Sequence, residues 1–260
     1  MTARRLLPLA AFAPIFEPFR GCKVGLVTPI GNVGDQLIGW ATEQLLEAYH
    51  IQWDYWRVDA PPNASFDQLA FGGGGNMGTR YRNNWELRNQ VFACGLPVTI
   101  LPQSFNSEEP RVYQRVFVRE QASLAYYPQG HLAPDLALGL TVDHVPPATR
   151  GLGIFLRRDP ERAHGIRWLR RDPVRMCKTP QQYFHLAASY RRIITDRLHF
   201  AVCGLLAGRQ VTLLPNDYHK NRSMHATWLG NLGCDFAESW QRAVLKRYRS
   251  RPNQSSTCAA

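Results

Sequence analysis

Cysteine pairs, metal-ligand clusters and long apolar runs are all missing from this sequence of 260 residues. Its six cysteines are scattered, with no C-x-x-C pair and no group of histidines at zinc-ligand spacing. This pattern favours free thiols in a reducing cytoplasm and argues against a disulfide framework or a structural zinc site. No stretch of about 20 consecutive apolar residues occurs, so we expect no transmembrane helix.

The beginning of the chain has a faint likeness to a secretory signal peptide. Arg4 and Arg5 precede the apolar stretch from Leu6 to Phe16. Prolines interrupt this stretch, however, and no A-x-A cleavage pattern follows it. We therefore expect a packed or interfacial N-terminal segment instead of a secretion signal.

Positive charge is in excess. Lysine and arginine total 31 against 20 acidic residues, which gives a formal net charge of +11. An anionic partner is therefore expected, whether phosphate, nucleic acid or a lipid surface. Two basic stretches, 156–161 and 167–171, are not accompanied by a nucleic-acid-binding motif, so we expect no nucleic-acid partner. For these arginines a diphosphate-bearing acceptor, an anionic membrane surface and a plain solvated face all stay open.

Short apolar runs alternate with amphipathic ones, which is typical of parallel strands joined by crossover helices. We expect an α/β fold of two Rossmann-like domains with parallel sheets, at residues 1–147 and 148–260. The boundary falls in Val145–Thr149, because its consecutive prolines cannot enter a helix or a central strand. A tail after about residue 250 is expected to be disordered. The expected strands are 23–28, 52–58, 69–71, 97–101, 116–118, 152–156, 192–194 and 211–214, and the expected helices 34–49, 83–94, 180–189, 196–207, 221–229 and 236–248.

Two glycine-rich segments follow expected strands, where ligands bind in parallel sheets. In Gly31-Asn32-Val33-Gly34-Asp35 the glycines allow a ligand to approach, and the helix that begins there offers free N–H groups to an anion. A tight turn capped by Asn32 or Asp35 is the alternative. For Gly72-Gly73-Gly74-Gly75-Asn76, close approach of a sugar or phosphate is preferred to a flexible loop, since four consecutive glycines cost chain entropy on folding.

Polar or charged groups follow three further strands. The segment Pro102-Gln103-Ser104-Phe105-Asn106 ends the strand 97–101 and offers groups that can bond sugar hydroxyls. Arg119 would direct a guanidinium toward a cleft, where it can bind a carboxylate or phosphate through two nitrogens; a solvated arginine at a helix start is the alternative. Lys220 would complete an anion site.

The most informative segment is Ile194-Thr195-Asp196-Arg197-Leu198-His199-Phe200-Ala201. Its threonine or aspartate can cap the helix that begins there, which places Arg197 and His199 in the first turn. Such a pair can bind an anion and move a proton. A histidine that merely packs and caps is the alternative.

Taken in order, these segments resemble the polysaccharide pyruvyl transferase family. The resemblance spans roughly Val24 to Lys220 and depends on the ordered set, with Asp196-Arg197-Leu198-His199 as its most distinctive part. The chain is short for the family, and Glu120 stands where an aspartate is usual. The other matching segments are 31–35, 72–75, 101–104, 119–123, Pro134-Asp135 and Phe155-Leu156-Arg157.

The resemblance implies a fold similar to that of the GT-B glycosyltransferases, with the acceptor on the side of residues 1–147. It also implies transfer of a carboxyethylidene group from phosphoenolpyruvate to sugar hydroxyls, which forms a cyclic ketal on an exopolysaccharide or cell-wall glycan. Arg197 and Arg119 would bind carboxylate and phosphate, His199 would donate or relay a proton, and Asp35 would accept the hydroxyl proton. No cofactor and no metal are expected. The further substrate-binding residues would be Gly31, Asn32, Gly34, Gly73, Gly74, Gly75, Gln103, Ser104, Leu198 and Lys220.

On this interpretation the partners are phosphoenolpyruvate and a lipid-linked or nucleotide-linked sugar. The enzyme would be cytoplasmic, with contact of its basic surface at the inner face of the membrane left open. Two other functions stay open as well. A nucleotide-sugar glycosyltransferase of the same fold would need an acidic residue for the ribose and a slot for the base, neither of which is identifiable. A catalytically inactive glycan-binding protein is the other.

Overall fold

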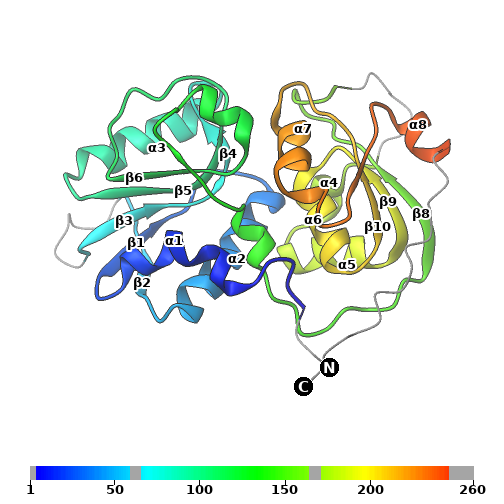
Figure 1. The fold of residues 1–260 in the computed structure, drawn as a ribbon, viewed down its shortest axis with the longest axis horizontal. Helices are drawn as coiled ribbons and strands as arrows, with labels where there is room; N and C mark the ends of the chain where they lie inside the picture. The colour runs from blue at the N-terminus through cyan, green and yellow to red at the C-terminus, as the bar shows by residue number, and fades with distance from the viewer. Residues whose placement is uncertain (1–3, 59–65, 164–170, 246–260) are drawn as a thin grey trace.

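The structure is a computed structural model that describes residues 4–58, 66–163 and 171–245. Two β-sheets lie side by side with helices packed against them (Figure 1). Every pairing between their strands is parallel, so the predicted α/β fold with parallel sheets is confirmed. The predicted disordered tail and the basic segment 167–170 lie outside the described residues.

The first sheet is built from β1 (Lys23–Val27), β2 (Gln52–Tyr55), β3 (Gln68–Phe71), β4 (Gly74–Met77), β5 (Val98–Phe105), β6 (Arg115–Val118) and β7 (His131–Leu132). Its order is β2-β1-β3-β5-β6-β7, and β4 also pairs with β5. After β1 the chain continues to β2 on one side of the sheet. From β3 it continues to β5, β6 and β7 on the other side. The carboxyl ends of β1 and β3 therefore form a topological switch point, the place where open parallel sheets bind ligands.

The second sheet contains β8 (Arg150–Phe155), β9 (Tyr190–Thr195), β10 (Gln210–Leu213) and β11 (Asp235–Phe236), in the order β11-β10-β9-β8. It begins directly after the predicted linker 145–149, which is neither helix nor strand. One apolar cluster includes buried side chains from both halves, such as Leu37 and Phe200. The predicted domain boundary itself stays a prediction.

The α-helices are α1 (Ala13–Phe16), α2 (Val33–Ala48), α3 (Arg82–Ala93), α4 (Pro173–Met176), α5 (Pro180–Ala188), α6 (Leu198–Leu206), α7 (Lys220–Met224) and α8 (Trp240–Leu245). Short 3-10 helices are η1 (Leu9–Phe12), η2 (Glu17–Phe19), η3 (Gln121–Ala125) and η4 (Leu136–Gly139), and η5 (His225–Leu229) is a π-helix. The predicted helix 196–207 thus begins two residues later, at Leu198.

Helix α2 packs against elements of both halves of the chain. Its apolar side chains recur at helical spacing, and Leu37, Ile38, Ala41 and Leu45 are all buried. It contacts η4 in the first half of the chain and both α5 and α6 in the second, and it runs between the two sheets in Figure 1. This packing places the N-terminus of α2, and the glycine-rich segment that precedes it, at the junction.

The N-terminal segment packs into the core. Phe12, Ile15, Phe16 and Phe19 are buried there. Each buried aromatic or branched side chain of this kind contributes roughly 2 kcal/mol of transfer free energy. Of the predicted packed or interfacial segment, the part from Phe12 to Phe19 is therefore packed.

Two predicted loop segments are strands instead. Strand β5 continues to Phe105, four residues beyond its predicted end at Leu101, because Gln103 and Ser104 lie in the ladder with buried side chains. In the glycine segment, Gly74 and Gly75 belong to β4, which pairs with β5, and Gly72 and Gly73 lead directly into it.

Candidate functional site

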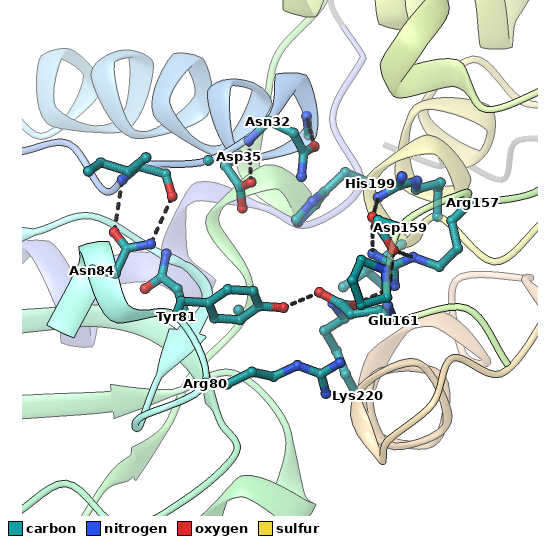
Figure 2. Close-up of a pocket in the computed structure, with 18 of the residues that line it drawn as sticks. Asn32, Asp35, Arg80, Tyr81, Asn84, Arg157, Asp159, Glu161, His199 and Lys220 are labelled. Carbon is teal, nitrogen blue, oxygen red and sulfur yellow. Dashed lines mark hydrogen bonds and ion pairs between the residues drawn. The ribbon is translucent and has the colours of Figure 1, made fainter.

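A cavity of about 530 Å³ lies at the junction of the two sheets (Figure 2). The N-terminus of α2 and the segment after β4 line it on one side, and the segment after β8 and the starts of α6 and α7 line it on the other. We call it the cationic cavity, because its lining includes Arg80, Arg119, Arg157, Arg197, His199 and Lys220. Three carboxylates, of Asp35, Asp159 and Glu161, face the same space.

The segment before α2 both caps the helix and lines the cavity. The Asn32 side chain accepts a hydrogen bond from the Gly34 N–H at 2.8 Å, and the Asp35 carboxylate accepts one from the Asn32 N–H at 2.8 Å. This is a capping box, so the turn-and-cap alternative is correct locally. Gly31, Asn32, Gly34 and Asp35 nevertheless all line the cavity. A Cβ atom at Gly31 would lie 2.3 Å from Asp35 Oδ2, so the turn requires glycine.

The second glycine segment packs closely against protein atoms. A Cβ at Gly73 would lie 3.0 Å from the Pro102 carbonyl oxygen. Gly74 has a φ of +154°, which favours glycine. A Cβ at Gly75 would lie 2.9 Å from Arg119 Nη2. Of these three predicted binding residues, only Gly75 lines the cationic cavity.

Gln103 and Ser104 hold other residues of the site in place through hydrogen bonds. The Gln103 side chain donates to the Gly72 carbonyl at 2.6 Å and so holds the glycine segment in place. Ser104 Oγ accepts from Arg119 Nε at 2.8 Å and donates to Glu120 at 2.7 Å. Both side chains are fully buried and neither lines the cationic cavity. Their predicted contact with sugar hydroxyls is therefore corrected to a supporting role.

Arg119 is a buried cation at the end of β6. Its Nη1 atom donates to Asp135 Oδ2 at 2.8 Å. Burial alone would lower the pKa of Arg119, but the carboxylates of Asp135 and Glu120 outweigh it and raise that pKa. The guanidinium therefore stays charged where it lines the cavity.

His199 lies in the first turn of α6, as predicted, with its side chain largely buried. Its Nε2 atom is 3.3 Å from the Asp135 carboxylate, which accepts the ring hydrogen and leaves Nδ1 for a ligand. A Cβ placed on Gly34 would lie 3.2 Å from Nδ1, so the ring faces the N-terminus of α2. Leu198 lines the cavity beside it.

Arg197 is the N-cap residue of α6 and is held by two carboxylates. Nε and Nη2 donate to Asp172 at 3.0 and 2.7 Å, and Nη1 lies 2.7 Å from Asp159 Oδ2. Burial would lower the pKa of Arg197, but Asp172 and Asp159 raise it above its ordinary value. Of the two predicted caps, Asp196 is wrong, because its carboxylate accepts from the Arg157 N–H at 2.8 Å instead. Thr195 Oγ1 accepts from the N–H of the N-cap residue Arg197 at 3.0 Å, one residue before the helix begins.

Glu161 occupies the middle of the cationic groups. Its Oε2 atom accepts from Lys220 Nζ at 2.7 Å and from Arg157 Nη1 at 2.5 Å, and its Oε1 atom accepts from the hydroxyl of Tyr81 (Figure 2). Burial would raise the pKa of Glu161, but Lys220 and Arg157 lower it below its ordinary value. The Lys220 pKa is lowered because the ammonium is buried. A carboxylate of the protein thus sits where an anionic ligand would meet these cations.

Several lining residues were not predicted from the sequence. Arg80 and Tyr81 reach the cavity from the segment before α3, and Arg80 forms a salt bridge to Asp217 at 2.5 Å. Arg157, Asp159 and Glu161 belong to the stretch 156–161, whose basic character does not by itself indicate that it lines the site. Asp135 and Arg157 both lie in segments of the family resemblance, which is the signal that could have identified them.

The described residues contain no cluster of His, Cys, Asp and Glu side chains that could hold a metal ion. Within residues 4–58, 66–163 and 171–245, no helix has the length and apolar character needed to cross a membrane.

Two parallel sheets with a cation-rich cavity at their junction define the class of this molecule, an α/β protein with a candidate site between its two sheets. The chain belongs to the polysaccharide pyruvyl transferase family, because the model of that family matches residues 32–218. This match confirms the resemblance found in the sequence. The matched region includes all the residues between Asn32 and His199 that line the cavity.

The fold is shared with a solved structure. An uncharacterised protein from Klebsiella pneumoniae is 22% identical with a TM-score of 0.69, over 86% of this chain and 95% of that one. A periplasmic sugar-binding protein of an ABC transporter from Legionella pneumophila is 13% identical, covers 83% and 87% of the two chains, and has a TM-score of 0.29, too low to indicate a common fold. A search of curated proteins found no match.

Proposed function

We propose that this protein transfers a carboxyethylidene group from phosphoenolpyruvate to two hydroxyls of a sugar, in the synthesis of an exopolysaccharide or cell-wall glycan. The observation that carries the proposal is the cationic cavity, which is lined by four arginines, a lysine and a histidine. Phosphoenolpyruvate carries a phosphate and a carboxylate on three carbons. A small, highly charged anion of this kind is what such a lining would select.

Arg119 and Arg197 bind the carboxylate and phosphate of the donor, as the resemblance implies. Asp159 and Glu161 form ion pairs with Arg197, Arg157 and Lys220. The donor takes over these contacts when it enters. Asp159 is the carboxylate that can release Arg197, because its side chain is 36% exposed whereas that of Asp172 is 2% exposed. Asp172 keeps Arg197 oriented throughout.

The reaction begins at the methylene carbon of the donor. His199 gives a proton to this carbon while a sugar hydroxyl attacks the adjacent carbon and passes its own proton to Asp35. The bond between that carbon and the phosphate oxygen then breaks, and phosphate leaves with its bonding electrons. A second hydroxyl attacks the resulting cation and closes the ketal. Of the two hydroxyl protons released, one replaces the proton that His199 gave up and the other leaves with phosphate, so the step balances.

The positive charge for this chemistry comes from the arginines and Lys220, which stabilise the developing phosphate. Asp135 holds the His199 ring through Nε2 at 3.3 Å. The donor therefore lies between the N-terminus of α2, which presents Asp35, and the first turn of α6, which presents His199. In this proposal the two sheets form two Rossmann-like domains of the GT-B type, at residues 1–147 and 148–260, with the acceptor on the side of the first.

The decisive experiment follows inorganic phosphate. The purified protein is incubated with phosphoenolpyruvate and a panel of lipid-linked and nucleotide-linked sugars, and the product is identified by mass. We expect phosphate release that depends on one acceptor, with one carboxyethylidene group gained per phosphate released. The His199→Ala variant should bind phosphoenolpyruvate and release phosphate at least about a hundredfold more slowly.

Calorimetry separates this function from a nucleotide-sugar glycosyltransferase. We expect binding of phosphoenolpyruvate and none of UDP, because of the two tyrosines among the described lining residues Tyr183 is buried and the Tyr81 ring already has the Arg80 guanidinium over it, 6.0 Å from the ring centroid. Tight binding of UDP together with no binding of phosphoenolpyruvate would overturn the proposal. Glycan retention by His199→Ala, with no phosphate released by the unaltered protein, would leave glycan binding as the function.

A further inference from the structure

A second cavity, of about 380 Å³, adjoins the cationic cavity. It lies over the carboxyl ends of β1 and β3 and along the first turns of α2, which is the switch point of the first sheet. The start of α5 closes it from the second half of the chain. Its polar, aromatic and glycine lining residues include Asp35, Gln36, Gly39, Trp40, Glu43, Tyr55 and Gln181.

The charge of the second cavity differs from that of the first. Its described lining includes two carboxylates, of Asp35 and Glu43, and no lysine, arginine or histidine. An anion would therefore be repelled here, whereas the cationic cavity beside it attracts one. The second cavity therefore suits a ligand without negative charge.

The lining of the second cavity combines flat rings with polar groups. Trp40 and Tyr55 supply the rings, and Tyr55 is 43% exposed. Gln36 and Gln181 are exposed amides that can donate and accept hydrogen bonds. The Tyr55 hydroxyl bonds one oxygen of Glu43, which fixes that carboxylate and leaves its other oxygen as an acceptor. Rings that pack against C–H groups, with amides and a carboxylate around them, match a polyhydroxylated ring.

Gly31 and Asp35 line both cavities. The Oδ2 atom of Asp35 accepts the Asn32 N–H, so Oδ1 is the oxygen left for another partner. A hydroxyl group of a ligand in the second cavity can therefore meet Asp35 at the edge of the cationic cavity. This is where the ketal must form if the donor occupies the cationic cavity.

We infer that the second cavity is the acceptor subsite and binds one neutral pyranose ring. The inference rests on the proposed function for its role in catalysis, but the sugar contact itself does not depend on the donor. A diphosphate attached to the sugar lies outside this cavity, since no cation lines it among the described residues.

Gly39 allows a sharp test. It lies in the interior of α2 and lines the cavity, and a Cβ atom there would meet nothing within 4 Å. Gly39→Leu therefore fills the cavity without a clash at the backbone, and replacing a helical glycine should hold or raise the melting temperature. Ala48→Leu is the matched control, because it adds the same side chain to an exposed position of the same helix.

The probes are methyl glycosides of glucose, galactose, mannose, N-acetylglucosamine and N-acetylmannosamine, with binding measured by saturation-transfer NMR and calorimetry. We expect at least one to bind the unaltered protein and Ala48→Leu alike, and Gly39→Leu to weaken it at least about tenfold while phosphoenolpyruvate binding is unchanged. Equal glycoside binding by Gly39→Leu, or no binding by any protein at millimolar concentrations, overturns the subsite. If the glycoside result holds and phosphoenolpyruvate never binds, the sugar site stands and the proposed reaction falls.

Discussion

His199 and Asp135 form a buried pair, with Nε2 3.3 Å from Oδ2. The same oxygen accepts a hydrogen bond from Arg119, so a histidine from one half of the chain and an arginine from the other share one carboxylate. Burial would raise the pKa of Asp135, but His199 and Arg119 outweigh it and lower that pKa below its ordinary value. Asp135 is therefore ionised at neutral pH and positions both side chains.

Asp135→Asn tests this positioning role. It keeps the shape of the side chain and removes the charge, and we expect kcat to fall by about ten- to a hundredfold because the imidazole loses its partner. The measurement is a double-mutant cycle with His199→Ala. Because Asp135 also holds Arg119, kcat is compared at saturating phosphoenolpyruvate, where weaker donor binding does not contribute, and there the double variant should be no slower than His199→Ala alone. Losses that multiply would show an independent role for the aspartate.

Gly34→Ala tests the approach of the His199 ring to α2. The added Cβ would lie 3.2 Å from Nδ1, the ring nitrogen that faces the ligand. We expect kcat to fall at least about tenfold, while the melting temperature holds because alanine is the better helix former. Gly151→Ala is the control, since a Cβ there meets nothing within 4 Å and Gly151 lines neither of the two cavities. Full activity in Gly34→Ala would place the reacting atoms elsewhere.

Asp159→Asn tests whether a carboxylate of the protein competes with the donor. Its removal frees Arg197 Nη1, so we expect the Kd for phosphoenolpyruvate to fall by up to about fivefold, the worth of a partly exposed ion pair.

Asp172→Asn should have the opposite effect on the Kd. That carboxylate is buried and bonds Arg197 through two nitrogens, so its loss should raise the Kd and cost about 3 kcal/mol or more of stability. Calorimetry and urea unfolding measure both, and a weaker donor complex in Asp159→Asn contradicts the competition.

Much of the fold could be predicted because its signals are local. The helix predicted at 34–49 is α2, since apolar residues such as Leu37 and Ala41 recur at helical spacing after a capping segment. The glycine segment was harder. Its four glycines suggested a ligand, and Gly72, Gly73 and Gly75 do line one of the two cavities. Packing against β5 and backbone conformation also require glycine at Gly73 and Gly74. Propensity cannot distinguish the two causes.

The site could be predicted in part. Arg197, Leu198, His199 and Asp35 line one cavity, as the ordered motifs indicated. Their partners are distant in sequence: Asp135 is 64 residues from His199. Such pairs depend on how the two halves pack, which no local pattern encodes. Gln103 and Ser104 were misplaced for the same reason, since burial on both faces of β5 is a tertiary property.

Asp196 makes a prediction about pH and stability. Burial raises its pKa to about 6, although the Arg157 N–H and guanidinium oppose the shift, and its Oδ2 atom has no hydrogen-bond partner among the described residues. The folded value exceeds the unfolded value of about 3.9, so the folded state holds this proton more tightly. Stability is therefore lost as pH rises from about 4 to about 6, by an amount on the order of 3 kcal/mol, and the loss persists above that window. Asp196→Asn cannot titrate, so its stability relative to the unaltered protein should rise across the same window. Urea unfolding at several pH values between 4 and 8 measures the difference, and parallel stability curves for the two proteins would contradict a raised pKa.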